Sequence, residues 1–103
     1  MDARELAVRE VAAWYLNDGY VRGPIPERLL LDGWRSYKKG WEMRISVPAD
    51  PAVVAEVRAQ IERAGLRLAR VYGKRNSRVI QPIYGRDQVL RVLKVAGVDT
   101  TGM

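Results

Sequence analysis

Residues 41–47 constrain the fold more than any other short stretch, because they carry an unbroken strand pattern. Apolar and polar side chains alternate along this stretch, and Met43, Ile45 and Val47 fall on the same side. Since successive side chains of a strand point to opposite faces, these three would lie in a core while the polar ones face away. The pattern therefore predicts a half-buried strand.

This strand leads directly into the most clearly bounded helix of the chain. Asp50 is a favourable N-cap residue, Pro51 fits the first helical position, and Gly65 follows the last turn. One apolar stripe would face the core, so the helix is expected to pack on a sheet. The stripe consists of Val53, Val54, Val57, Ile61 and Ala64.

The rest of the chain divides into short elements by the same criteria of periodicity and turn residues. The order predicts a single α+β domain over residues 1–97, followed by a flexible tail over residues 98–103. Helix, two strands, helix, two strands and helix follow one another. Besides those above, the predicted elements are helices over 3–16 and 86–96 and strands over 20–22, 66–74 and 78–84, the last two joined by a turn at 75–77.

One position in the last strand does not fit its pattern. Gln81 falls on the same side as the core-facing Val79 and Ile83, where a polar side chain is unfavourable. Pro82 beside it cannot donate a backbone hydrogen bond. We therefore expect a β-bulge at this point, which would change the direction of the side chains around it.

Composition excludes several classes of function. The chain of 103 residues has no cysteine and no histidine, which excludes disulfides, thiolate metal sites, catalytic triads and zinc chemistry. It has no apolar run long enough to cross a membrane and no signal-like segment at its start, so a cytoplasmic location without membrane contact is expected. Any catalysis would depend on carboxylates, lysines, tyrosines or an oxygen-bound metal.

The distribution of charge favours a polyanionic partner. The formal net charge is +6, and no acidic residue occurs between Glu62 and Asp87. Residues 34–41 also mix cations with aromatic side chains, which suits phosphate contact together with stacking on bases. The basic residues of the acid-free stretch are Arg63, Arg67, Arg70, Lys74, Arg75, Arg78 and Arg86.

Residues 11–19 carry the most direct functional signal. Ala12 and Ala13 are small neighbours on an apolar helix, so a second helix could approach closely. The helix ends at Asp18, and Gly19 is the expected left-handed terminator. A carboxylate is unfavourable at a helix C-terminus because that end carries partial negative charge. We therefore expect a cation near Asp18, and a metal ion is one candidate.

This segment resembles the motif helix that names the LAGLIDADG homing endonucleases. When the acid–glycine pairs are aligned, Ala13 stands where the family usually has glycine and Leu16 replaces a non-catalytic acid. Asp18 falls on the acid that binds a divalent metal in the family. The predicted element order also resembles the αββαββα half-unit of that fold over nearly the whole chain. In that fold a four-stranded antiparallel sheet forms a saddle over DNA.

The resemblance implies a homodimer, because members with one motif pair through their motif helices around a twofold axis. The alternative is that the first helix packs only on its own sheet. The residues that the resemblance places at the dimer interface are Val8, Val11, Ala12, Ala13, Tyr15 and Leu16.

The resemblance also implies cleavage of double-stranded DNA. Two Asp18 carboxylates, one from each subunit, would hold Mg²⁺ between the scissile phosphates, where the metal polarises a phosphoryl oxygen and activates water. Two departures bear on this activity: the chain ends at Met103, where the family often continues to a lysine, and Ser46 stands where some members have glutamine. A non-catalytic DNA-binding protein or regulator of the same fold is one alternative. A small basic α+β domain that binds RNA or protein is another.

Strand alternation and the basic segment nominate the DNA-contacting residues. In a saddle, side chains opposite the core face the DNA, where arginines can reach guanine edges and lysines more often contact phosphates. The predicted contacts are Arg22, Arg35, Tyr37, Lys38, Lys39, Arg44, Ser46, Arg70, Tyr72, Lys74, Arg75 and Arg78.

Overall fold

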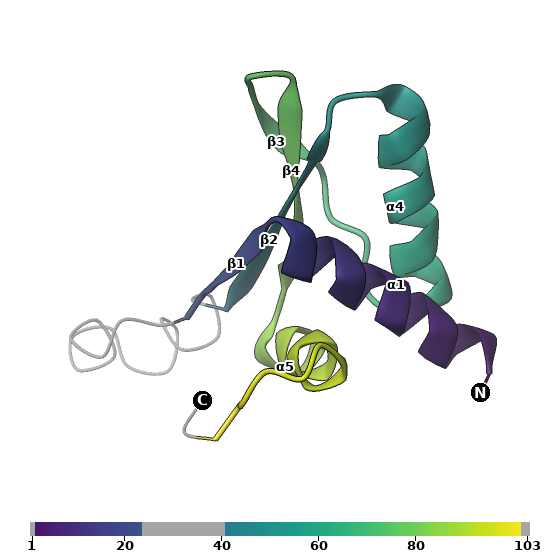
Figure 1. The fold of residues 1–103 in the computed structure, drawn as a ribbon, viewed down its shortest axis with the longest axis vertical. Coiled ribbons are helices and arrows are strands. Elements are labelled where there is room, and N and C mark those ends of the chain that lie inside the picture. The colour runs from purple at the N-terminus through teal and green to yellow at the C-terminus, as the bar shows by residue number, and fades with distance from the viewer. Residues whose placement is uncertain (1, 24–40, 102–103) are drawn as a thin grey trace.

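The computed structural model describes residues 2–23 and 41–101, except for the side chain of Lys74. The elements are α1 (Ala3–Asn17), β1 (Gly19–Arg22), β2 (Glu42–Pro48), α4 (Pro51–Arg63), β3 (Tyr72–Arg75), β4 (Arg78–Tyr84) and α5 (Arg86–Val95). This order confirms the predicted α+β domain with αββαββα connectivity (Figure 1).

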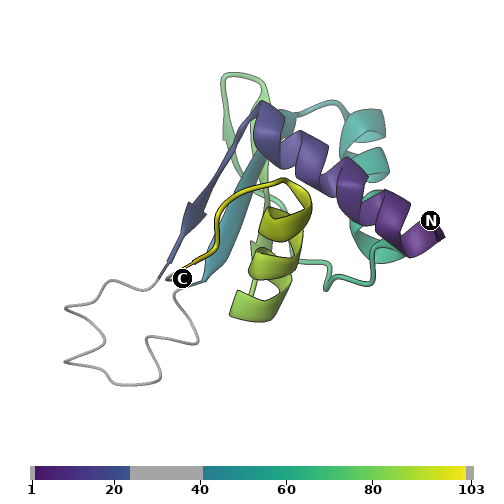
Figure 2. The ribbon, with the colours of Figure 1, turned by 60° about the horizontal axis from the view of Figure 1, so that its bottom comes forward.

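The four strands form one antiparallel sheet in the order β1-β2-β4-β3. The helices lie together on one side of this sheet, and Figure 2 shows the same arrangement from a second direction. α1 lies between α4 and α5 and contacts both of them. Within the described part of the chain, no helix lies on the opposite side of the sheet.

The core fills the space between the sheet and the helices. Met43, Ile45 and Val47 of β2 are completely buried, which confirms the strand predicted from their alternation. Ile83 of β4 is buried beside them. The helices contribute Val8, Val11, Val57, Ile61, Val89, Val92 and Leu93 to the same core.

α1 joins β1 without the turn that the sequence predicted. Asp18 is the C-cap residue of the helix, and Gly19 already belongs to the strand. Gly19 has no positive φ, so the prediction of a left-handed terminator is wrong. Close approach explains the glycine instead. A Cβ atom at Gly19 would lie 2.8 Å from the Tyr15 ring and 3.0 Å from the Arg44 carbonyl oxygen.

α4 has the boundaries that its end residues predicted. The Asp50 carboxylate accepts a hydrogen bond of 2.8 Å from the Ala52 backbone N–H, and Pro51 is the first helical residue. Gly65 follows the helix with a φ of +74°, which is the left-handed conformation that glycine adopts without steric cost. Local sequence signals therefore suffice to define this helix.

The β3–β4 hairpin is shorter on its first strand than predicted. β3 begins at Tyr72, so Arg70 lies in the connection from α4 rather than in the sheet. The turn consists of Asn76 and Ser77, whose φ angles are 52° and 62°. Two successive residues with positive φ match the right-handed twist of the flanking strands, which is typical of tight hairpins.

The bulge predicted at Pro82 lies elsewhere. β2 and β4 pair without any shift of register, and Pro82 pairs with Arg44. The register shifts in β3 instead, between Tyr72 and Arg75, where Gly73 has a φ of +66°. Because β3 has one extra residue at this point, Tyr72 and Arg75 face the same side of the sheet.

Gln81 does face the core, as its position in the strand indicated, and it is completely buried. Its amide nitrogen donates to the Ala69 and Pro82 carbonyl oxygens at 2.9 and 3.1 Å. Its amide oxygen accepts a 2.9 Å hydrogen bond from Arg58 of α4. The polar side chain is tolerated because its hydrogen bonds are made inside the protein.

Candidate nucleic-acid interface

The side of the sheet away from the helices, which we call the open face, carries most of the charged and aromatic side chains of the strands. Residues paired across strands share a face, and the core-facing residues of β2 identify which face is which. The open face consists of Tyr20, Arg22, Glu42, Arg44, Ser46, Pro48, Tyr72, Arg75, Arg78, Ile80, Pro82 and Tyr84.

A hydrogen-bonded ion pair lies at the centre of the open face. Arg44 Nε donates to Glu42 Oε1 at 2.9 Å, and Arg44 Nη1 donates to the Tyr20 hydroxyl at 2.7 Å. The Tyr72 hydroxyl donates to Glu42 Oε2 at 2.9 Å. The Glu42 side chain is only 12% exposed. These bonds hold the Arg44 guanidinium in one position, which sequence alternation alone does not reveal.

Three tyrosines surround this ion pair, and we call Tyr20, Tyr72 and Tyr84 the tyrosine cluster. The Arg44 guanidinium carbon lies 5.6 Å from the centre of the Tyr20 ring and 5.9 Å from that of the Tyr72 ring, within the range of cation–π attraction. The cluster remains open to solvent, with exposed fractions of 51%, 38% and 46% respectively.

The contacts around Glu42 raise the pKa values of Tyr72, Tyr84 and Arg44. Burial and then the hydrogen bond to Glu42 raise the pKa of Tyr72 to about 12. Burial, the negative charge of Glu42 and a hydrogen bond to it raise the pKa of Tyr84. The hydrogen bonds to Tyr20 and then Glu42 raise the pKa of Arg44. Arg44 therefore stays charged and both tyrosines stay neutral at physiological pH.

The raised pKa of Tyr72 predicts a loss of stability at high pH. Unfolded tyrosine releases its proton near pH 10, whereas the folded protein holds the Tyr72 proton up to about pH 12. Between these two pH values the unfolded state binds fewer protons than the folded state. The contribution of Tyr72 to the free energy of unfolding is therefore fully present below about pH 10 and is lost as pH rises toward 12. Tyr72→Phe should flatten this fall in a denaturant-unfolding series across that pH range. Equal slopes for the two proteins would contradict the assignment.

Asp18 lies at the edge of the open face, beside Ser46 and Arg78. Its carboxylate Oδ2 is 3.5 Å from Arg78 Nε, and its backbone oxygen accepts a 2.9 Å hydrogen bond from the Ser46 N–H. Arg78 also donates to Ser46, from Nε to the hydroxyl at 2.8 Å and from Nη2 to the carbonyl oxygen at 3.0 Å. The cation expected near the helix end is therefore present as a guanidinium.

The described residues around Asp18 do not by themselves make a magnesium site. Magnesium prefers six oxygen ligands in octahedral geometry. Asp18 supplies one carboxylate that is 55% exposed and already faces Arg78. Over residues 2–23 and 41–101, no three acidic, histidine or cysteine side chains come together to hold a metal ion. A metal here would need ligands beyond these described residues.

The residues proposed for a dimer interface divide between the two sides of α1. Val8, Val11 and Ala12 are buried in the core of their own chain. Tyr15 packs partly against the same core. Ala13 and Leu16 are exposed, and Leu16 retains 61% of its surface. The exposed members of the predicted dimer interface therefore lie on the outer side of α1.

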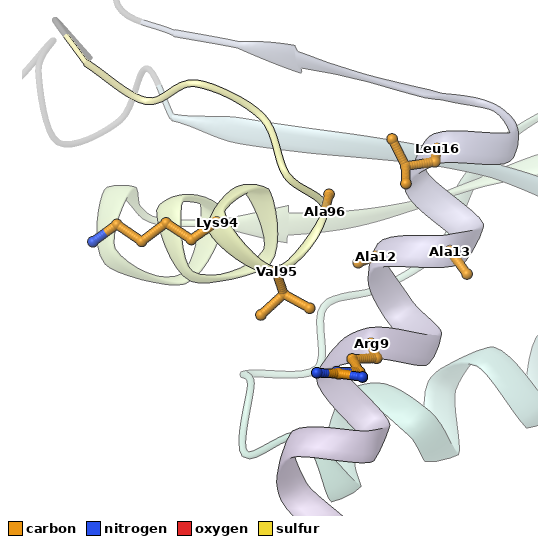
Figure 3. A pocket seen from close by; sticks show the side chains of 7 residues that line it. All are labelled: Arg9, Ala12, Ala13, Leu16, Lys94, Val95 and Ala96. Carbon is orange, nitrogen blue, oxygen red and sulfur yellow. The ribbon is translucent and has the colours of Figure 1, made fainter.

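A hollow of about 490 Å³ lies between this outer side of α1 and the C-terminal end of α5. Figure 3 shows Leu16 and Val95 beside the hollow, while the Lys94 side chain extends away from α1. Val95 is 44% exposed. The hollow is lined by Arg9, Ala12, Ala13, Leu16, Lys94, Val95 and Ala96.

The structure brings only part of the predicted DNA-contacting set together. Arg22, Arg44, Ser46, Tyr72, Arg75 and Arg78 share the open face. Arg70 is exposed outside the sheet. Arg35, Tyr37, Lys38, Lys39 and the Lys74 side chain lie outside the described residues.

Three members of this surface were not among the predicted DNA contacts: Tyr20, Glu42 and Tyr84, although alternation did place Glu42 on the side of its strand opposite the core. Tyr20 could have been found, because it lies two residues from Arg22, which was already predicted to contact DNA. Tyr84 could have been found by continuing the alternation of its strand from Arg78. The burial of Glu42 could not, because it depends on the Tyr72 side chain arriving from another strand.

The chain was compared with protein-family models, curated proteins and solved structures, and none of these comparisons gave a match. Among the described residues, no helix is both long and apolar enough to cross a membrane. The functional argument therefore depends on the geometry of this chain.

Proposed function

We propose that this protein binds double-stranded DNA through the open face, as a LAGLIDADG-like half-unit that pairs with a second copy along α1. The observation that carries the proposal is a helix-backed sheet whose other side gathers arginines and tyrosines. A two-stranded or wider β-surface can enter the major groove, where arginine recognises guanine and also contacts phosphates.

The charge balance of the open face supports a polyanionic ligand. Arg22 and Arg75 are exposed at its edges. The acidic side chains of the open face among the described residues are Glu42, which Arg44 neutralises, and Asp18 at its edge, which faces Arg78. Binding to duplex DNA should therefore release counterions and weaken as salt rises.

The exposed side of α1 supports the pairing of two copies. Leu6 and Leu16 are 50% and 61% exposed, and Ala13 lies between them on the same side of the helix. Exposed leucines beside a small residue suit the approach of another helix, which would cover both leucines. A twofold contact at this position would bring the two open faces onto one DNA duplex.

Cleavage is a separate part of the proposal, because the described residues of one chain do not supply a magnesium site. The resemblance assigns Asp18 to metal binding, while the ion pair with Arg78 supports a role in fixing the edge of the open face. DNA binding should consequently be independent of magnesium. Asp18→Asn would remove any metal-dependent cleavage and leave the affinity for duplex DNA in EDTA within about threefold of wild type, as expected for loss of one exposed ion pair.

The proposal predicts that charge reversal on the open face weakens DNA binding strongly. Arg22→Glu combined with Arg75→Glu should lower the affinity for a duplex by roughly 10- to 100-fold and reduce the salt slope by about two. Fluorescence anisotropy at about 50 and about 200 mM salt measures both quantities.

Arg63→Glu combined with Arg91→Glu is the matched control, because it changes the net charge equally on the helical side. This control should stay close to wild type. Equal losses for the two double variants would mean that only total charge matters, and duplex binding through the open face would then be rejected.

A further inference from the structure

We infer that the tyrosine cluster is a stacking platform for unpaired nucleobases, so that the open face takes DNA with locally single-stranded character. The inference rests on the proposed function and names the state of the DNA that the face accepts. It assigns the centre of the open face to bases and the arginines at its edges to phosphates.

The path of the Tyr72 side chain provides the first argument. Tyr72 belongs to β3, and its hydroxyl reaches Glu42 on β2, although β4 lies between these two strands. The side chain must therefore extend across β4 instead of standing away from the sheet. β4 has the small residue Pro82 at the position that pairs with Arg44, and Pro82 is buried. The Tyr72 side chain thus runs over β4, while 38% of the residue's surface stays exposed.

The Tyr20 ring is fixed in a similar way from the other side. Its hydroxyl accepts a 2.7 Å hydrogen bond from Arg44, the cross-strand neighbour of Tyr20 in β2. Half of the Tyr20 surface nevertheless remains exposed. A ring whose polar end is bound at the centre of the sheet offers mainly its apolar surface to a ligand.

For the tyrosines, these constraints favour stacking on bases over insertion into a groove. Side chains that read base edges in a duplex must project from the protein surface. The hydroxyls of Tyr20 and Tyr72 are instead tied to Arg44 and Glu42, so the rings are held down. A held ring with a free face can stack on any exposed base, because every base has an aromatic face.

The spacing of the cluster suits successive bases. Tyr20, Tyr84 and Tyr72 come from β1, β4 and β3, which follow one another across the sheet with β2 between the first two. Strands lie about 4.8 Å apart, so the backbone positions of the three tyrosines span roughly 14 Å across the sheet. The Arg44 guanidinium between the Tyr20 and Tyr72 rings adds a cation that attracts a base stacked nearby.

The test compares two single strands that differ only in their bases. The wild-type protein is titrated with a fluorescent oligothymidine strand and with a strand of equal length built from abasic sites, which keeps the phosphates. A blunt duplex serves as the third probe. Since each stacked base is worth about 5- to 150-fold in affinity, the base-bearing strand should bind at least about tenfold more tightly than the abasic strand.

Two variants connect this difference to the cluster. Tyr20→Ala combined with Tyr84→Ala should remove most of the preference for bases. Tyr20→Phe combined with Tyr84→Phe should keep part of it, because both rings remain but lose the hydroxyl hydrogen bonds that hold them. Circular dichroism and thermal unfolding show whether each variant is folded. The wild-type comparison does not depend on the variants, so a misfolded variant cannot hide the result.

Equal affinity of the wild-type protein for the abasic and the base-bearing strand would overturn the stacking platform. The proposed function would then still stand if the duplex binds. Failure of all three probes would overturn the proposed function as well. A base preference that survives in the double alanine variant would also overturn the assignment to these tyrosines.

Discussion

Gln81→Ala should destabilise the fold by about 3 kcal/mol, although Gln81 lies on the core side of the sheet and not on the open face. Gln81 is completely buried and connects three segments through hydrogen bonds to Arg58, Ala69 and Pro82. The substitution leaves a cavity and removes one of two acceptors of Arg58 Nη1, which keeps its hydrogen bond to the Ala69 carbonyl oxygen. Leaving buried polar groups without partners costs more than an ordinary hydrogen bond contributes.

Urea unfolding followed by circular dichroism measures this change. Gln88→Ala is the matched control, because Gln88 also bonds to two backbone groups, Arg67 N–H and the Tyr84 carbonyl oxygen, but lies nearer the surface. The control should cost about 1 kcal/mol. Equal losses at Gln81 and Gln88 would contradict the view that the buried network holds α4 against the sheet.

Ala13→Arg should convert a dimer into a monomer. The wild-type protein is expected to have a solution mass twice the 11.7 kDa of one chain. Ala13 is exposed on the outer side of α1, so arginine at this position need not disturb the core of its own chain. It would place a large charged side chain, and its desolvation cost, in the middle of a helix-to-helix contact.

Light scattering at moderate salt measures the mass of both proteins. Ala55→Arg on α4 is the matched control, since Ala55 is likewise an exposed alanine within a helix. The control should keep the wild-type mass. A wild-type monomer, or a dimer that is indifferent to Ala13→Arg, would reject the proposed pairing along α1.

The elements with strong local signals could be predicted from sequence. The alternation in β2 and the cap residues of α4 determine those two elements, because each depends on neighbours in the chain. The order of the seven elements follows from the same kind of signal. Gln81 was placed correctly on the core side, but its hydrogen-bond partners come from other elements and could not be inferred.

The predictions that failed depended on how the chain packs around a residue, which the residue type alone does not show. Pro82 suggested a bulge in β4, but the bulge is in β3, where Gly73 permits positive φ. Gly19 suggested a left-handed helix end, but the close approach of Tyr15 and the Arg44 carbonyl explains it. Neither the position of the bulge nor the close approach at Gly19 can be inferred from the pattern of neighbouring residues.

The candidate site was predictable only in outline. Alternation assigned Arg44 to the exposed side of β2, and the structure agrees. It could not show that Glu42, two residues earlier, is covered by a tyrosine from another strand. The inner side of α1 also contains small and apolar residues, so sequence alone did not separate core contacts from a possible interface.

The most direct test of the central claim is to map the DNA-contacting surface by the backbone amide signals of isotope-labelled protein during titration with a DNA duplex. The account predicts that the signals of β1, β2, β3 and β4 shift, with those of Arg22, Arg44 and Tyr72 among them, while those of α4 stay in place. Shifts concentrated on α4 and α5, or no shifts at a DNA concentration that saturates anisotropy, would contradict DNA binding through the open face.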